Sequence, residues 1–231
     1  MSTVYDVAVV GSSGFLGGAI ARDLERHGRA VARFTRQDPV RVDDALAGTA
    51  RDVAAVVWAA GSISPTVAAE RPDMVDAELA DFRATVAALA ALPTQPRIVL
   101  LSSGGAVYGR PAEPPYAEAD APHPPNAYGE YKRAEEEILA AAPNATTAIR
   151  VANAYGPGQT GRRGQGVLAI WMNAIAADDP IVVHGSGEVA RDYVYVDDVA
   201  DAVARVLDHP AAPPVVNVGS GVPTRLADLL G

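Results

Sequence analysis

The stretch VYDVAVVGSSGFLG, residues 4–17, joins a short apolar run, a loop with three glycines and the start of an amphipathic segment. The apolar run predicts a buried strand, and helical spacing of apolar side chains continues over residues 14–27. The first glycine permits a tight turn, the second lets backbone approach a pyrophosphate, and the third lets the helix pack closely on the strand. This unit predicts a dinucleotide site at the helix N-terminus. The loop residues expected at the cofactor are Gly11, Ser13, Gly14, Phe15, Leu16 and Gly17.

The rest of the chain alternates predicted strands with predicted helices. Strands are expected at 30–34, 52–60, 97–101 and 147–151, and helices at 72–92 and 126–142. Such alternation predicts an α/β fold, a doubly wound parallel sheet of the Rossmann type with right-handed crossovers. After residue 151 the pattern loosens. We therefore expect a dinucleotide-binding core over residues 1–151 and a mixed region over 152–231, which includes a smaller and incomplete C-terminal substrate lobe.

Composition and charge exclude several classes of protein. The 231 residues carry a net charge of −9 and contain no cysteine. The acidic balance argues against a nucleic-acid partner, and the lack of cysteine excludes disulfides and thiolate metal sites. No apolar run approaches the roughly 18 residues of a membrane span, and no signal-peptide pattern opens the chain. We therefore expect a cytoplasmic protein with no membrane partner. The four histidines lack metal-ligand spacing, so no metal is expected.

The end of the second predicted strand bears on the choice between NAD and NADP. An acidic residue there would hold the ribose 2′-hydroxyl, but the sequence reads Arg33-Phe34-Thr35-Arg36. Arg36 either pairs with a 2′-phosphate or is a solvated surface arginine. Asp43, or its neighbour Asp44, is expected near the adenine.

Lys132 is the only lysine of the chain, and Tyr128 precedes it by four residues, so the two share one face of a helix. A tyrosine is a poor base because its free pKa is about 10, but a nearby ammonium and a cationic nicotinamide ring favour the phenolate. Tyr128 would then be a usable acid or base for a sugar hydroxyl. Ser103, at the end of the fourth predicted strand, could hold the same oxygen. Ser102 competes for that role, and Tyr108 either packs or lines the pocket.

These features resemble the extended short-chain dehydrogenase/reductase family, which contains nucleotide-sugar epimerases and dehydratases. The matching segments, in family order and over essentially the whole chain, are Gly11/Gly14/Gly17, residues 57–61, Ser102-Ser103, Tyr128/Lys132, residues 153–158 and residues 191–200. The resemblance implies NAD(P) as cofactor and a nucleotide-diphosphate sugar as substrate. Further cofactor contacts that we expect are Arg36, Asp43, Ala59, Ala60, Gly61 and Lys132.

The resemblance also implies which residues contact the substrate. They are Ser62, Ser103, Tyr128, Asn153, Val167 and Arg191, and the catalytic set is Ser103, Tyr128 and Lys132. Asn153 and Arg191 match positions that contact the substrate diphosphate. For Arg191 the alternative is an ion pair with Asp197 or Asp198. We expect those two aspartates to form the N-cap and first turn of a helix. Arg162 and Arg163 either reach a phosphate or are solvated.

The implied reaction takes place at carbon 4 of the sugar, through a 4-keto intermediate. Where a dehydratase of this family carries an acid–base pair, the chain has Gly104, Gly105 and Ala106, which cannot transfer protons. We therefore expect an NDP-hexose 4-epimerase with retained NAD. The alternative is reduction of an NDP-4-keto sugar by NADPH, which Arg36 favours. A second alternative is a dinucleotide-binding protein with little turnover, because the chain stops at Gly231, soon after a helix that Thr224 would cap.

The family commonly forms dimers through two helices of each subunit. In this chain those helices would be residues 72–92 and 126–142, which makes a homodimer possible, with a monomer as the alternative. Three consecutive acidic residues, Glu135, Glu136 and Glu137, suit an exposed edge of the second helix.

Overall fold

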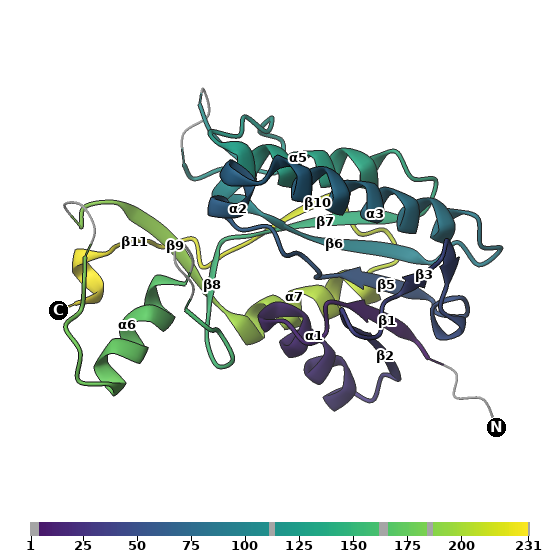
Figure 1. Ribbon diagram of the computed structural model, residues 1–231, viewed down its shortest axis with the longest axis horizontal. Coiled ribbons are helices and arrows are strands. Elements are labelled where there is room, and N and C mark those ends of the chain that lie inside the picture. Colours follow the sequence, from purple (N-terminus) through teal and green to yellow (C-terminus); the bar gives the residue numbers. More distant parts are fainter. Residues whose placement is uncertain (1–4, 111–113, 162–165, 184–186, 231) are drawn as a thin grey trace.

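The computed structural model describes residues 5–110, 114–161, 166–183 and 187–230 (Figure 1). Six strands form the main sheet, and every pairing within it is parallel. They are β1 (Val7–Val10), β2 (Val31–Phe34), β5 (Ala55–Trp58), β6 (Arg97–Ser103), β7 (Thr146–Val151) and β10 (Val215–Val218). The predicted α/β fold with a doubly wound parallel sheet is confirmed, and the strands form where short apolar runs were expected.

The order of the strands places a ligand crevice beside β1. Across the sheet the order is β10-β7-β6-β5-β1-β2, so the chain leaves β1 on one side for β2 and returns on the other side for β5. Open α/β sheets bind ligands outside the carboxyl ends of the strands where the order reverses. The crevice therefore opens just after Val10 and Trp58. A short hairpin of β3 (Arg41–Val42) and β4 (Ala45–Leu46) and the 3₁₀ turn η1 (Gly48–Ala50) lie between β2 and β5 in the chain.

Helices cover both faces of the sheet, as Figure 1 shows. One face carries α1 (Phe15–Arg26) and α7 (Val196–Asp208), which pack against each other and bury Ile20, Leu24 and Val203 on the strands. The other face carries α2 (Pro65–Glu70), α3 (Pro72–Ala90) and α5 (Ala127–Ala140). On this side Phe82 of α3 meets the ring of Trp58 with 4.9 Å between centroids. Two apolar cores, one on each face, fix the helices relative to the strand ends.

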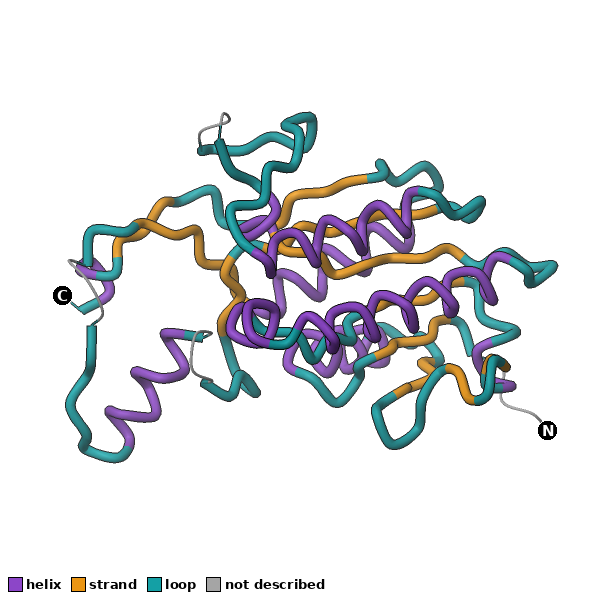
Figure 2. The backbone as a smooth tube through the Cα atoms, turned by 45° about the horizontal axis from the view of Figure 1, so that its top comes forward, coloured by secondary structure: helices purple, strands orange, loops and turns teal. Residues whose placement is uncertain are grey.

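The part of the chain after β7 contributes to two regions. Helix α7 and strand β10 complete the core, whereas β8 (Asn153–Tyr155), β9 (Ala190–Tyr195) and β11 (Pro223–Arg225) form a separate three-stranded sheet. Figure 2 shows this small sheet and α6 (Val167–Ala176) extending from the end of the main sheet at which β7 and β10 finish. Asp192 of β9 ties the regions together, because its carboxylate accepts from Ser220 and Gly221 just after β10. Residues 152–231 therefore contribute both to the core and to the smaller sheet.

Two expected helix starts differ from the structure. Thr224 caps no helix: it lies in β11 opposite Arg191, and only a three-residue 3₁₀ turn, η2 (Ala227–Leu229), follows. Asp197 and Asp198 occupy the first turn of α7, as expected, but the N-cap position belongs to Tyr195. The backbone at Thr224 pairs with β9 as a strand, so its polar groups are satisfied by strand pairing and no helix begins there. Arg162 and Arg163 lie outside the described residues, and no helix within the described ranges is long and apolar enough to cross a membrane.

Candidate active site

The loop after β1 packs backbone against backbone. Gly11 has φ +86°, and a Cβ placed there would lie 2.6 Å from the amide nitrogen of Ala60. A Cβ at Gly17 would overlap the carbonyl oxygen of Gly11 and lie 3.2 Å from the Cβ of Ala59. Only glycine fits either position without a shift of the backbone. The first turn of α1 is thereby held directly against the ends of β1 and β5.

No side chain of the glycine loop caps the N-terminus of α1. Gly14 is the N-cap, no side chain caps the helix, and its first turn carries no acidic residue. The buried hydroxyl of Ser12 donates to the carbonyl of Phe34 at 3.0 Å and so fixes the loop to β2, whereas Ser13 is exposed. The first-turn N–H groups and the positive end of the helix dipole are therefore free to bind an anion. Phe15 and Leu16 begin the helix and are partly buried, and Ala59, Ala60 and Gly61 follow β5 beside it.

Two arginines near the end of β2 have different surroundings. Arg33 donates two hydrogen bonds to Glu25, at 2.6 and 2.8 Å, and this carboxylate raises the pKa of the guanidinium. Arg36 is exposed and has no hydrogen-bond or ion-pair partner within the described ranges. It is thus free to meet a ligand. Asp43 lies at the exposed tip of the β3–β4 hairpin with φ +44°, and its neighbour Asp44 pairs with Arg41 at 2.7 Å.

The two adjacent serines at the end of β6 differ in burial and in hydrogen bonding. Ser102 is buried, and its hydroxyl donates to the carboxylate of Glu136. Ser103 is partly exposed, and its hydroxyl has no partner in the described part of the chain. The chain then turns into the short helix α4 (Gly104–Val107). A Cβ at Gly129 would overlap the carbonyl oxygen of Ala106, so the first turn of α5 lies directly against α4.

Helix α5 carries Tyr128 and Lys132. Its N-cap is Asn126, whose side chain accepts from the amide of Gly129 at 3.0 Å. Tyr128 is partly exposed, and no residue that the structure describes is bonded to its hydroxyl. Lys132 is buried, with its ammonium 2.8 Å from Glu135 and 3.4 Å from the carbonyl oxygen of Leu101 at the end of β6. Burial alone would lower the pKa of Lys132, but the charge of Glu135 and the interaction with Tyr128 outweigh it and raise that pKa above its ordinary value.

The expectation that Glu135, Glu136 and Glu137 form an exposed edge is wrong for two of them. Successive helical residues are rotated by about 100°, so three in a row cannot share one face. Glu135 is fully buried beside Lys132, and Glu136 is buried against Arg150, with three contacts of 2.7–3.2 Å. Only Glu137 is exposed.

Arg150 of β7 connects the strand ends behind the candidate site. Besides Glu136, it donates to the hydroxyl of Tyr108 at 2.8 Å and lies over the ring of that tyrosine. Tyr108 in turn donates to Asn217 of β10 at 2.8 Å. The spacing of Glu136 and Arg150 in the sequence gives no sign that they are partners, because they are 14 residues apart and meet only when α5 packs on β7.

Among the expected substrate residues, Ser62 and Asn153 follow the carboxyl ends of β5 and β7, and Ser103 is the last residue of β6. Ser62 follows β5, and both its amide and its hydroxyl donate to Glu78 of α3. Asn153 opens β8 and donates its side-chain amide to the carbonyl of Asp192 at 3.0 Å. Val167 begins α6.

Arg191 is exposed on β9. Its guanidinium donates to the carbonyl of Ala190 at 3.0 Å. Among the described residues it forms no ion pair with Asp197 or Asp198. The alternative of a structural ion pair with either aspartate is therefore wrong, and the guanidinium is open to an anionic ligand.

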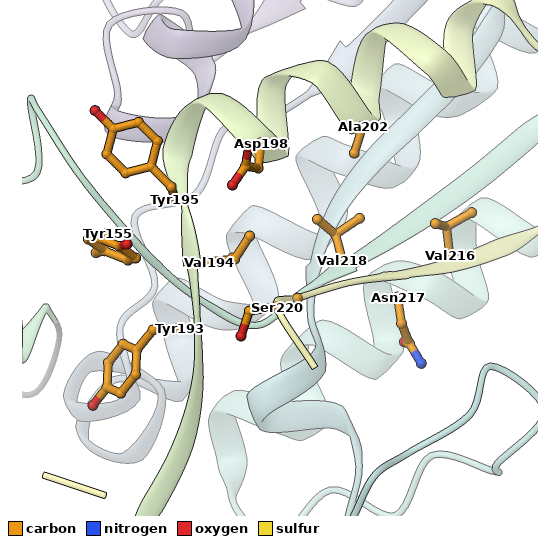
Figure 3. Close-up of a pocket in the computed structure, with 11 residues that line it drawn as sticks. Tyr155, Tyr193, Val194, Tyr195, Asp198, Ala202, Val216, Asn217, Val218 and Ser220 are labelled. Atoms are coloured by element: carbon orange, nitrogen blue, oxygen red, sulfur yellow. The ribbon is translucent and has the colours of Figure 1, made fainter. Parts of the chain in front are cut away.

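A separate hollow of about 470 Å³ lies between β9, α7 and β10 (Figure 3). Tyr155, Tyr193 and Tyr195 form one side of it, and Asn217 and Ser220 lie on the other. None of the expected site residues lines this hollow. The glycine loop, Ser103 and the first turns of α5 lie instead at or next to the carboxyl ends of β1 and β6.

The chain matches the sequence profile of the NAD dependent epimerase/dehydratase family over residues 7–219. It belongs to this family. Members of this family include nucleotide-sugar epimerases. The match confirms the resemblance of this chain to the extended short-chain dehydrogenases/reductases.

Two curated relatives within this epimerase/dehydratase family match part of the chain at 37% identity. One is the dTDP-4-dehydro-6-deoxyglucose reductase of Escherichia coli, over 138 residues that make up 58% of this chain and 43% of the relative. The other is the UDP-glucose 4-epimerase of Mycolicibacterium smegmatis, over 137 residues, 58% of this chain and 44% of the relative. The matched segments thus span less than half the length of these relatives.

A solved structure in the same family covers almost the whole chain. The UDP-glucose 4-epimerase of Thermus thermophilus, in complex with NAD, is 27% identical and superposes with a TM-score of 0.81. The superposition covers 97% of this chain and 81% of that one. The fold is therefore shared with an epimerase that was solved with NAD.

The packing at Gly17 can be tested by adding one methyl group. Gly17→Ala should weaken the binding of NAD and NADP by about 10-fold or more, because the new Cβ overlaps the Gly11 carbonyl and must displace α1. Isothermal titration calorimetry measures both affinities.

Gly48→Ala is the matched control for that substitution, because a Cβ at Gly48 meets no atom within 4 Å. The control should bind both dinucleotides as the unchanged protein does. Equal affinities for the Gly17 variant and the control would contradict the assignment of the loop to the dinucleotide.

Proposed function

We propose that this chain is a nucleotide-sugar 4-epimerase that works through a 4-keto intermediate. The observation that carries this proposal is the contrast between four neighbouring hydroxyl groups. Ser102 is bonded to Glu136, and Tyr131 to Glu135 and Glu78, whereas Ser103 and Tyr128 have no partner in the described part of the chain. Two unbonded hydroxyls beside a buried ammonium are the arrangement that proton transfer to and from a sugar oxygen requires.

In this proposal Tyr128 accepts the proton of the sugar 4-hydroxyl at its phenolic oxygen and later returns it. The hydroxyl of Ser103 hydrogen-bonds the same sugar oxygen and holds it for the transfer. The buried ammonium of Lys132 favours the phenolate of Tyr128 through its charge. Gly104, Gly105 and Ala106 bring no acid or base to the site, so the keto intermediate can only be reduced again.

The residues that would hold the dinucleotide fit that ligand. The uncapped N-terminus of α1 suits the pyrophosphate, with Gly11, Ser13, Gly14 and Gly17 giving it close access to the backbone. When bound, nicotinamide supplies the acceptor and donor of the hydride. The remaining residues that we assign to the cofactor are Phe15, Leu16, Arg36, Asp43, Ala59, Ala60, Gly61 and Lys132.

We assign the nucleotide-diphosphate sugar to the opposite wall of the crevice. Arg191 has no acidic partner among the described residues, and its guanidinium suits a diphosphate. A Cβ at Gly105 would lie 3.9 Å from the side-chain amide nitrogen of Asn153, so that side chain reaches the short helix α4 after β6. Ser62 and Val167 belong to the segments that follow β5 and open α6. The Mycolicibacterium relative, named as an enzyme of UDP-glucose, supports this class of substrate.

A second candidate is the NADPH-dependent reduction of a 4-keto sugar. Arg36 carries this alternative, because its guanidinium has no partner within the described ranges and stands just after β2, where a 2′-phosphate would lie. The Escherichia coli relative is named as a reductase of this kind. Both reactions use Tyr128 and the 4-keto species, and they differ in whether the hydride is recycled or consumed. A dinucleotide-binding protein with little turnover is the third candidate.

We also propose a homodimer formed through α3 and α5, in the cytoplasm, where nucleotide sugars are available. A groove of about 490 Å³ between these helices supports the dimer. Small apolar side chains, among them Ala87, Ala90 and Ala141, line it and would permit close helix packing.

The nucleotide that copurifies with the protein distinguishes the two reactions. The epimerase recycles its cofactor, so protein purified without additives and then denatured should release stoichiometric NAD, identified by mass spectrometry. A protein that is empty but binds added NADPH would point to the reductase. A protein that binds neither dinucleotide would contradict both.

Tyr128→Phe should abolish turnover, by at least about 100-fold, because the acid–base hydroxyl is removed. The affinity for the dinucleotide should stay nearly unchanged. Turnover is measured by chromatography of UDP- and dTDP-hexoses, and affinity by calorimetry. Tyr193→Phe is the control, since Tyr193 lines the separate hollow. Retained activity in Tyr128→Phe would show that another group is the base.

Arg36→Ala should weaken the binding of NADP by about 10-fold while the binding of NAD changes little, because only NADP carries the 2′-phosphate. Arg205→Ala on α7, which removes an exposed arginine paired with Asp201, should change neither affinity. Titration with both dinucleotides measures the ratio. An equal loss for NAD and NADP would mean that Arg36 does not contact the phosphate.

A further inference from the structure

A chain of hydrogen bonds connects Lys132 to the loop after β5. The Lys132 ammonium is 2.8 Å from Oε2 of Glu135, and Oε1 of Glu135 is 2.9 Å from the hydroxyl of Tyr131. The same hydroxyl is 2.6 Å from Oε1 of Glu78, and Oε2 of Glu78 accepts from the amide of Ser62 at 3.0 Å. We call Glu78, Tyr131 and Glu135 the acidic cluster. It joins α5 to α3 and to the candidate site.

The acidic cluster contains one hydrogen bond more than its ordinary hydrogens allow. Tyr131 has a single hydroxyl hydrogen, yet its oxygen lies within hydrogen-bond distance of two carboxyl groups. If both carboxyl groups were ionised, one of these contacts would bring two electron-rich oxygens together with no hydrogen between them. Such a contact is costly where water is excluded. A proton carried by one of the two carboxyl groups and donated to the Tyr131 oxygen supplies the missing hydrogen.

The surroundings of the acidic cluster support the presence of this additional proton. Tyr131 and Glu135 are buried, and Glu78 is half-buried. The Lys132 ammonium lies 5.0 Å from the centroid of the Tyr131 ring, and the hydrophobic side chains that pack with this ring, besides Tyr128, are Ile63, Val67, Ala68, Met74, Val75 and Leu79. Lys132 is the one cation that contacts the cluster among the described residues, so one positive charge faces two carboxyl groups. Burial raises the pKa of Glu135, against the opposing effect of Lys132, and burial with both carboxyl charges raises that of Tyr131.

Neither carboxyl group alone explains the contacts. Glu135 faces Lys132, which suits an ionised carboxylate, and Glu78 accepts from the amide and hydroxyl of Ser62, which also suits an ionised carboxylate. The proton is then best placed between them, on the path through Tyr131.

We propose that Glu78 and Glu135 share one proton through Tyr131, and that this acidic cluster is a positioning group whose charge controls how Lys132 supports Tyr128. With the proton in place, the cluster carries one negative charge, which Lys132 balances. When the proton is lost, a second negative charge appears beside Lys132 and opposes the phenolate of Tyr128. The second part of this inference rests on the proposed role of Tyr128, whereas the first part does not.

The shared proton can be observed without any turnover. In the full-length protein with carboxyl-labelled glutamate, infrared spectroscopy at neutral pH should show the carbonyl band of a protonated carboxylic acid that shifts with the isotope. The band should disappear in Glu78→Gln and in Glu135→Gln, because an amide can donate to Tyr131 and the remaining carboxyl group can then ionise. Glu130→Gln, an exposed position on the same helix, should retain the band. Absence of the band in the unchanged protein, or its survival in both cluster variants, would overturn the inference.

The control of Tyr128 is tested by the pH profile of turnover. In the unchanged enzyme, kcat should fall at alkaline pH as the shared proton is lost. In Glu78→Gln the cluster cannot gain a second charge, so the alkaline fall should move to higher pH, by about one pH unit or more. Glu130→Gln should keep the original profile. If the pH profile of Glu78→Gln coincides with that of the unchanged enzyme, the proposed effect of the acidic cluster on Lys132 is contradicted.

The two possible failures are distinguishable. If no nucleotide sugar is turned over, the proposed function fails, and the infrared band decides by itself whether the proton is shared. If turnover is found and the band is absent, the acidic cluster fails while the proposed function stands. Thermal unfolding of each variant shows whether it folds, and Tyr131→Phe, which keeps the buried ring and removes the bridging hydroxyl, should also lose the band.

Discussion

The contact between the carbonyl of Gly11 and the α-carbon of Gly17 is the constraint on which the rest of the candidate site depends. A side chain at Gly17 would push α1 away from Gly11 and Ala59, and a side chain at Gly11 would push the loop after β1 away from Ala59 and Ala60. Because α1 starts directly at the strand ends, its uncapped N-terminus opens into the crevice where the strand order reverses. Everything assigned to the cofactor and substrate is arranged around this one backbone contact.

Helix α5 forms the opposite wall and is held by buried charges. Glu136 bonds Arg150 of β7 and Ser102 of β6, while Glu135 bonds Lys132 and Tyr131. Breaking a buried pair leaves an uncompensated charge, which commonly costs about 3–5 kcal/mol. Such pairs make the position of the helix specific rather than merely stable. They also bond the hydroxyls of Ser102 and Tyr131, which sets these two apart from Ser103 and Tyr128.

The single lysine has a structural explanation. Its ammonium lies between a carboxylate of its own helix and the carbonyl of Leu101 at the end of β6. A compact ammonium fits this buried position, whereas a planar guanidinium with five donors would need more space and more acceptors. In a chain that otherwise uses arginine for its basic residues, the lysine at this position follows from geometry.

The parallel sheet, the glycine loop and the placement of Tyr128 one helical turn before Lys132 could all be predicted from the sequence alone. These depend on local spacing: apolar runs, three glycines and an interval of four residues on a helix. The sequence could not show that Glu135 and Glu136 are buried, that Thr224 pairs in a strand, or that Ser102 is bonded and Ser103 is not. Three of these facts depend on a partner far away in the chain: Arg150 for Glu136, Arg191 for Thr224 and Glu136 for Ser102. Only tertiary packing chooses such partners, because a buried polar group must be bonded to whatever the fold places beside it.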